Sequence, residues 1–136
     1  MGRQKRAGPT DAELEVLRVL WESGGSTVRQ ISRALAGSRL VSRTSVPKIV
    51  QLMADKGLVR RLPMEPHPVD GMRDPQIFVA AVGQTNTQRK VLRDLIDRLF
   101  GGSPSDLIMR AISAKRASPA ELEKIRRHLK DLESQD

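Results

Sequence analysis

Residues 42–62 read SRTSVPKIVQLMADKGLVRRL. In the first part of this segment the apolar side chains recur at three- and four-residue intervals, which predicts a helix with one buried face. Gly57 is a natural end for this helix, because a glycine after the last turn adopts the left-handed conformation without strain. The predicted buried stripe comprises Val46, Ile49, Val50 and Met53.

The start of this helix has two interpretations. It lies near Ser42 or Thr44, and Pro47 follows closely. A proline inside a helix costs roughly 3 kcal/mol, whereas in the first turn its missing N–H has little effect. The helix therefore begins nearer Thr44, or it is locally distorted at Pro47, and the sequence is compatible with both.

Two shorter helices are predicted before this segment. Thr10 and Glu13 have the spacing of a capping box, which opens a helix that ends at residues 23–25. Ser26 can cap a second helix, which ends at residues 37–38. Three short helices joined by turns that contain glycine are typical of a helix-turn-helix.

The pattern changes after Gly57. Residues 58–62 and 76–80 have the composition of short strands, and the intervening residues 63–75 contain four prolines and no periodic pattern. Two strands and a loop directly after a third helix form a wing. We therefore expect a winged helix-turn-helix domain over residues 10–82, preceded by a disordered basic arm at residues 1–9.

Residues 83–136 predict three further helices, which makes the protein mainly α with a small β wing. About 50 helical residues cannot close a sufficient core alone, so we expect this region to form a symmetric homodimer. The alternative is a monomer whose C-terminal helices fold back on the winged helix. The apolar side chains expected at the dimer interface are Leu92, Leu95, Ile96, Leu99, Ile108, Ile112, Leu122, Ile125 and Leu129.

The polar face of the third helix is the candidate DNA reader. Opposite the buried stripe lie Thr44, Lys48 and Gln51, whose side chains suit thymine, guanine and adenine respectively. Arg43 and Ser45 flank them. The alternative interpretation is an ordinary solvated helix face. Phosphate contacts are predicted for a wider set of polar side chains, namely Ser42, Arg29, Arg39, Arg60, Arg61 and Arg73.

Composition supports a nucleic-acid partner and excludes several other classes. The net charge of +8 favours polyanions, and the aromatic share of 2% is too small for base stacking on single strands. The absence of cysteine excludes disulfide scaffolds, zinc fingers and thiolate catalysis. His67 and His128 have no partners at a useful spacing, so we expect no enzyme activity, no metal and no cofactor.

The sequence also predicts where the protein resides. No apolar run approaches the length of a membrane span, and the basic start lacks the apolar stretch of a signal peptide. We therefore expect a cytoplasmic protein without membrane insertion.

Three functions compete at this point. The first is a sequence-specific repressor that binds a double-stranded operator as a homodimer. The second is a non-specific or architectural DNA-binding protein with the same charge but equal affinity for any duplex. The third is a protein-interaction adaptor that uses a winged helix without nucleic acid.

Several motifs resemble the BlaI/MecI penicillinase-repressor family of winged-helix transcriptional regulators. Residues 10–17 (TDAELEVL), with Leu20 and Trp21 after them, resemble the opening of that family. Residues 43–46 (RTSV) and 56–59 (KGLV) are similar to its recognition helix and to the turn into its wing. The resemblance covers residues 9–82 well and continues beyond them mainly as a similar layout of helices.

The resemblance implies a dimeric repressor that binds inverted-repeat operators through the third helix and the wing. In the best-known systems of this family, a membrane-bound sensor metalloprotease detects a β-lactam, and the repressor is cleaved in its dimerisation region. The position similar to the scissile Asn-Phe bond is occupied here by Arg110 and Ala111. Leu52 and Met53 and the long, proline-rich wing loop also depart from the usual pattern of the family.

Overall fold

The computed structural model of the protein describes residues 8–135, so most of the arm predicted for residues 1–9 lies outside the described residues. The chain forms two compact units, which divide between Val91 and Leu92, and each unit is considered by itself. The expected domain boundary at residue 83 stays a prediction.

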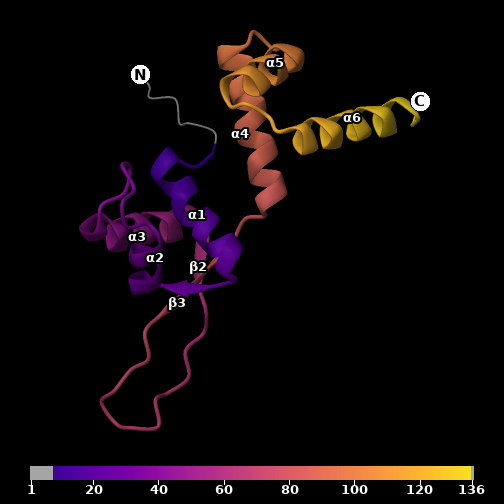
Figure 1. The fold of residues 1–136 in the computed structure, drawn as a ribbon. Coiled ribbons are helices and arrows are strands. Elements are labelled where there is room, and N and C mark those ends of the chain that lie inside the picture. The colour runs from indigo at the N-terminus through magenta and orange to yellow at the C-terminus, as the bar shows by residue number, and fades with distance from the viewer. Residues whose placement is uncertain (1–7, 136) are drawn as a thin grey trace. The chain divides into compact units, whose positions relative to one another are not determined.

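The predicted fold class is confirmed, because six α-helices within residues 8–135 accompany one small antiparallel sheet (Figure 1). The first unit contains α1 (Asp11–Ser23), β1 (Ser26–Thr27), α2 (Val28–Ala34), the 3₁₀ turn η1 (Arg43–Ser45), α3 (Val46–Lys56), β2 (Val59–Arg61) and β3 (Ile77–Ala80). Then follow α4 (Gln84–Leu99), within which the boundary between the units falls, α5 (Pro104–Ala114) and α6 (Pro119–Glu133).

The sheet has one more strand than the two predicted, and its order is β1-β3-β2. The prediction that Ser26 caps α2 is wrong, because Ser26 lies in β1 and pairs with Phe78 of β3. Thr27 is the cap: its hydroxyl accepts the Gln30 N–H at 3.1 Å, and the Gln30 side chain accepts the Thr27 N–H at 2.9 Å. This reciprocal capping box fixes the start of α2 one residue later.

The structure settles how the third helix begins. Residues 43–45 form the 3₁₀ turn η1, and the α-helix starts at Val46, which places Pro47 in its first turn. The missing N–H of the proline is therefore at a position where no helical hydrogen bond is lost. At the other end Gly57 has φ of 82°, the left-handed conformation expected of it.

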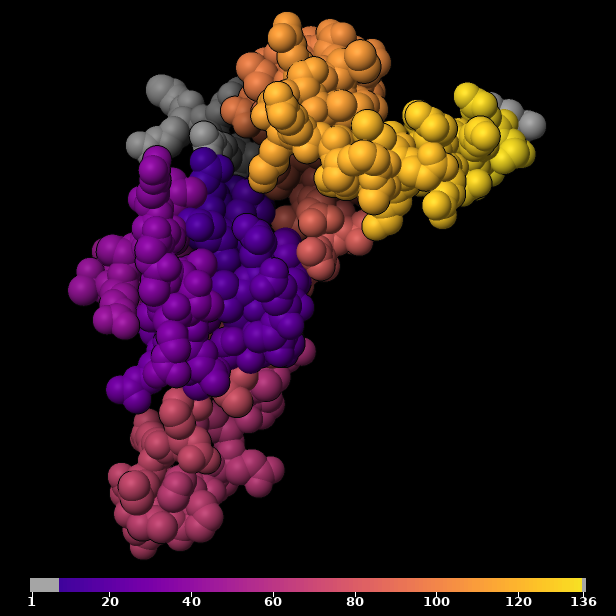
Figure 2. Space-filling model, in the orientation of Figure 1, coloured from indigo at the N-terminus to yellow at the C-terminus, as the bar shows by residue number. Residues whose placement is uncertain are grey.

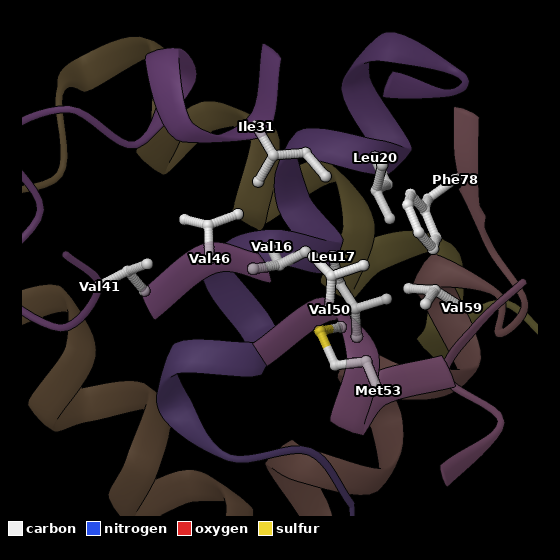
Figure 3. Close-up of a cluster of buried hydrophobic side chains, with 10 residues drawn as sticks. All are labelled: Val16, Leu17, Leu20, Ile31, Val41, Val46, Val50, Met53, Val59 and Phe78. Carbon is white, nitrogen blue, oxygen red and sulfur yellow. The ribbon is translucent and has the colours of Figure 1, made fainter. Parts of the chain in front are cut away.

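The hydrophobic core joins α1, α2, α3 and the sheet (Figure 3). Val46, Val50 and Met53 of the predicted stripe are buried, and Ile49 is half-buried against them. The apolar face of α3 thus holds this helix on the two helices before it. Among residues 8–135, the buried cluster comprises Val16, Leu17, Leu20, Ile31, Val41, Val46, Val50, Met53, Val59 and Phe78.

Trp21, at the end of α1, lies against the segment that leads into α4. Its indole N–H donates to the backbone carbonyl of Val82 at 3.0 Å. This bond spans 61 residues of sequence and attaches Val82, two residues before the start of α4, to the first helix.

An ion pair joins the start of α1 to the end of α3. Glu13 of α1 is buried, and its carboxylate accepts from Lys56 Nζ at 2.8 Å and from the Thr10 N–H at 2.9 Å. Burial raises the pKa of the Glu13 carboxyl, but the hydrogen bonds and the charge of Lys56 outweigh it, so the pKa is lowered overall. Lys56 is the last residue of α3, so this pair fixes the end of that helix to α1.

We predict that Lys56→Met destabilises the protein by about 1–2 kcal/mol at neutral pH, because a buried carboxylate loses a charged donor. The lowered pKa means that the pair stabilises the fold above the pKa of an unfolded glutamate, about 4.3, and that this contribution is lost as the pH falls further. Urea unfolding at pH 7 and pH 3 measures the destabilisation and its dependence on pH. The difference between wild type and variant should shrink at pH 3, and an equal difference at both pH values would contradict the assignment.

The second unit has well-defined helix starts but no buried residue among residues 92–135. Ser103 caps α5 by accepting the Asp106 N–H at 3.2 Å. Ser118 and Glu121 form a capping box at the start of α6, and the hydrogen bond from the Ser118 N–H lowers the pKa of Glu121. The helix starts are therefore well capped, whereas none of the apolar side chains of residues 92–135 is fully buried within the chain.

Candidate nucleic-acid interface

The polar face of α3 and of the turn before it is directed to solvent. Thr44, Lys48 and Gln51 are all exposed, while Val46 and Val50, on the other side, are fully buried. The helix is thus held by its apolar side and leaves its polar side free. This is the arrangement that a recognition helix needs in order to enter a major groove.

Three hydroxyl groups gather at the N-terminal end of this segment. The Ser42 hydroxyl lies 2.6 Å from that of Ser45 and 3.4 Å from that of Thr44. Ser42 and Thr44 are exposed, and Ser45 is half-buried. Such hydroxyls donate to phosphate oxygens, so this cluster fits the phosphate contacts expected from the sequence.

The turn that leads to this cluster is pinned to α1. Ser38 donates its hydroxyl hydrogen to Glu15 Oε2 at 2.8 Å. The same hydroxyl oxygen accepts the backbone N–H groups of Leu40 and Val41, each at 3.1 Å. These bonds fix the path of the backbone just before η1, and they hold exposed Arg39 on that path.

A contact that sequence reasoning missed joins two of the candidate residues. Arg61 of β2 donates from Nη2 to Gln51 Oε1 at 2.8 Å, and Gln51 Nε2 donates to Asp55 Oδ1 at 3.2 Å. The Arg61 guanidinium also lies over the Phe78 ring, 5.4 Å from its centre. The four-residue spacing of Gln51 and Asp55 gave a signal for one of these contacts, but nothing in the sequence fixed the position of Arg61.

The remaining basic candidates are exposed but separate. Arg29 lies on α2, Arg43 in η1, Arg60 on β2 and Arg73 in the wing loop. Among the residues that the structure describes, no hydrogen bond or ion pair joins their side chains to the other candidates.

The wing loop is long and projects beyond the rest of the first unit (Figure 2). Gln76 closes its base: the side chain amide donates to the Leu62 carbonyl at 2.8 Å, and the Leu62 N–H donates to the Ile77 carbonyl at 2.9 Å. Within residues 63–75, three acidic side chains accompany Arg73, so this loop is less basic than the rest of the chain.

The predicted dimerisation residues are accessible to a partner. Leu92, Leu99, Ile108, Leu122 and Leu129 are exposed, with Leu99 67% exposed. Four others are half-buried, namely Leu95, Ile96, Ile112 and Ile125.

The candidate cleavage position lies in a helix. Arg110 and Ala111 are both exposed and belong to α5. A protease reads extended backbone, so the bond between them would become available only if this helix unwound.

The described part of the chain offers little for other chemistry. His67 lies 3.6 Å from Asp74 in the wing loop, and His128 is exposed on α6. Residues 8–135 contain no group of three or more metal-ligating side chains. No helix among them has the length and apolar character needed to cross a bilayer.

The fold and the exposed face of α3 define the class of protein, a winged-helix regulator of the helix-turn-helix type. A family model described as penicillinase repressor matches residues 9–131, and the chain belongs to that family. Members of this family are DNA-binding transcriptional repressors and not enzymes. No curated protein sequence matches the chain.

Several solved structures are similar to the chain at low sequence identity. RV1404 from Mycobacterium tuberculosis has a TM-score of 0.50 and 19% identity, over 90% of this chain and 70% of that one. The reduced form of MarR from E. coli has a TM-score of 0.46 and 17% identity, over 91% and 77%. A MarR family transcriptional regulator from Silicibacter pomeroyi has a TM-score of 0.45 and 16% identity, over 90% and 68%.

Proposed function

We propose that this repressor binds a specific inverted-repeat operator as a homodimer in the cytoplasm. The observation that carries the proposal is the two-sided character of α3, with a fully buried apolar stripe and an exposed polar face. Thr44, Lys48 and Gln51 would contact base edges. Phosphates would be contacted by the hydroxyl cluster of η1 and by the exposed arginines around it.

The dimer is inferred from the second unit. A 44-residue set of helices without one buried residue has no core of its own, yet its apolar side chains follow regular helical spacing. A second copy supplies the missing apolar surface, and two-fold pairing is the commonest solution for identical chains. A two-fold dimer would in turn require a two-fold operator.

The recognition-face prediction is that Lys48→Ala and Gln51→Ala each lower the affinity for the specific operator by about 1–3 kcal/mol without affecting the fold. Each change removes a base contact from an exposed position. Electrophoretic mobility shift at fixed salt measures the effect. Matched controls are Lys115→Ala and Gln88→Ala, which remove the same side chains from exposed positions outside α3.

Non-specific or architectural DNA binding is the second candidate, and the charge of +8 favours it as well. It predicts the same affinity for all duplexes at matched salt, whereas a repressor protects one site with two-fold symmetry. Footprinting on genomic fragments separates the two. If the triple change of Thr44, Lys48 and Gln51 to alanine left function intact, an adaptor role without DNA would be favoured instead.

Release from the operator is proposed to occur through a membrane-bound sensor metalloprotease. Cleavage between Arg110 and Ala111 would separate α6 from the winged helix and remove part of the apolar surface. Loss of the linked second half-site then weakens operator binding. A gene for a membrane metallopeptidase beside the repressor gene, and a fragment mass that matches this bond after induction, would support this route. An intact repressor after induction would contradict it.

A further inference from the structure

The side chain of Gln51 is held between two partners of opposite character. Arg61 donates to its oxygen Oε1 at 2.8 Å, and its nitrogen Nε2 donates to Asp55 at 3.2 Å. A guanidinium can only donate hydrogen bonds, and an ionised carboxylate can only accept them. The amide can therefore satisfy both partners in one orientation only, with its oxygen toward Arg61 and its nitrogen toward Asp55.

Arg61 is a fixed partner because the sheet positions it. It lies on β2, where it pairs with Phe78 of β3, and its guanidinium lies 5.4 Å from the centre of the Phe78 ring. Phe78 is itself buried in the core. A guanidinium over an aromatic face is attracted to that face, so the wing holds the Arg61 donor beside α3.

The bonds within the protein leave a defined pattern on the amide. Oε1 has two lone pairs and Nε2 has two hydrogens, and each partner uses one of them. One acceptor and one donor remain on the same exposed amide. In the major groove, adenine presents the complementary pair, a donor at N6 and an acceptor at N7.

We propose that Arg61 and Asp55 are positioning residues that orient Gln51 to select adenine at one base pair of each operator half-site. The inference rests on the proposed function, since it requires α3 to lie in the major groove. It changes the expected role of Arg61, which is directed to Gln51 and not to a phosphate. It also explains an acid on the recognition face: Asp55 repels phosphates and weakens binding to all duplexes, but it fixes the orientation of a base reader.

The test compares base preference and not affinity alone. The wild-type protein first selects its operator from a random duplex library, and synthetic duplexes then carry each of the four base pairs at each position in turn. Binding is measured for wild type, Gln51→Ala, Arg61→Met, Asp55→Ala and Asp55→Asn. Arg60→Met is the matched control, because it removes the same charge from the neighbouring residue of β2.

The position at which Gln51→Ala loses preference identifies the base pair that Gln51 reads. There we expect wild type to favour adenine by about 5- to 150-fold, the range for a bidentate contact. Arg61→Met and Asp55→Ala should reduce this preference to about twofold, with other positions unchanged. Asp55→Asn should retain much of the adenine preference, because the asparagine side chain keeps an acceptor. Asp55→Ala should bind random duplexes more tightly, because it removes a carboxylate that repels phosphates. Arg60→Met should weaken all duplexes equally.

Two failures are distinguishable. A wild-type protein that enriches no sequence would overturn the proposed function. A wild-type protein that enriches an operator, together with an unchanged preference in Arg61→Met and Asp55→Ala, would overturn the positioning role alone. So would an Arg61→Met variant that behaves like Arg60→Met and loses affinity for every duplex alike.

Discussion

Leu129→Glu is expected to convert the proposed homodimer into a monomer and to lower operator affinity by about a hundredfold or more. Leu129 is 51% exposed and follows Leu122 and Ile125 along α6 at seven- and four-residue intervals, the spacing of a coiled-coil seam. A charge at the centre of an apolar interface has to be desolvated without a partner. Two linked half-site contacts bind about 10²–10⁴ times better than one, and the monomer loses this gain.

Sedimentation equilibrium and operator titration together check this result. Lys130→Glu is the control, because it changes the charge by more than Leu129→Glu does and lies outside the seam. It should sediment as wild type. If Leu129→Glu retained the mass and the operator affinity of wild type, the seam on α6 would not mediate the dimer. Ile125→Glu provides an independent position on the same seam.

Leu17→Ala should lower the free energy of unfolding by about 3–5 kcal/mol, because it removes a fully buried side chain from the centre of the core. Leu17 belongs to the cluster that contains Val46 and Val50 of α3, so the cavity lies beneath that helix (Figure 3). Such a loss is a large share of the 5–15 kcal/mol typical of a whole domain.

Guanidinium titration measures the change, and operator binding should decrease with the folded fraction. Leu40→Ala is the matched control. Leu40 is 57% exposed in the turn before η1, so its truncation should change stability by less than about 0.5 kcal/mol. Equal effects of the two substitutions would show that this cluster is not the stabilising core.

Local signals explain which parts of the fold the sequence predicted. The capping boxes of α1 and α6 depend on residues three positions apart, so both could be recognised without knowledge of the rest of the chain. The buried stripe of α3 follows from helical periodicity alone. β1 was missed because two residues are too few to show an alternating pattern, and its pairs with β3 lie 50 and 52 residues apart in the sequence.

The candidate site likewise combines features that local sequence predicts with one that depends on tertiary structure. The exposure of Thr44, Lys48 and Gln51 follows from the stripe opposite them, because both depend on the same helical period. The bond from Arg61 to Gln51 depends on how the sheet packs beside α3, and this is a property of tertiary structure. Contact of any of these residues with DNA stays a prediction until a duplex has been tested.

The hydrogen bond from Trp21 to Val82 makes the indole an intrinsic fluorescent probe of the segment before α4. The chain has one tryptophan and no tyrosine, so near-ultraviolet emission excited at long wavelength comes from a single indole. That indole donates a hydrogen bond to the backbone carbonyl of Val82, two residues before α4. A rearrangement of this segment, whether caused by operator, inducer or proteolysis, would change the surroundings of the one fluorophore. The rearrangement could then be followed in real time by tryptophan fluorescence without a label.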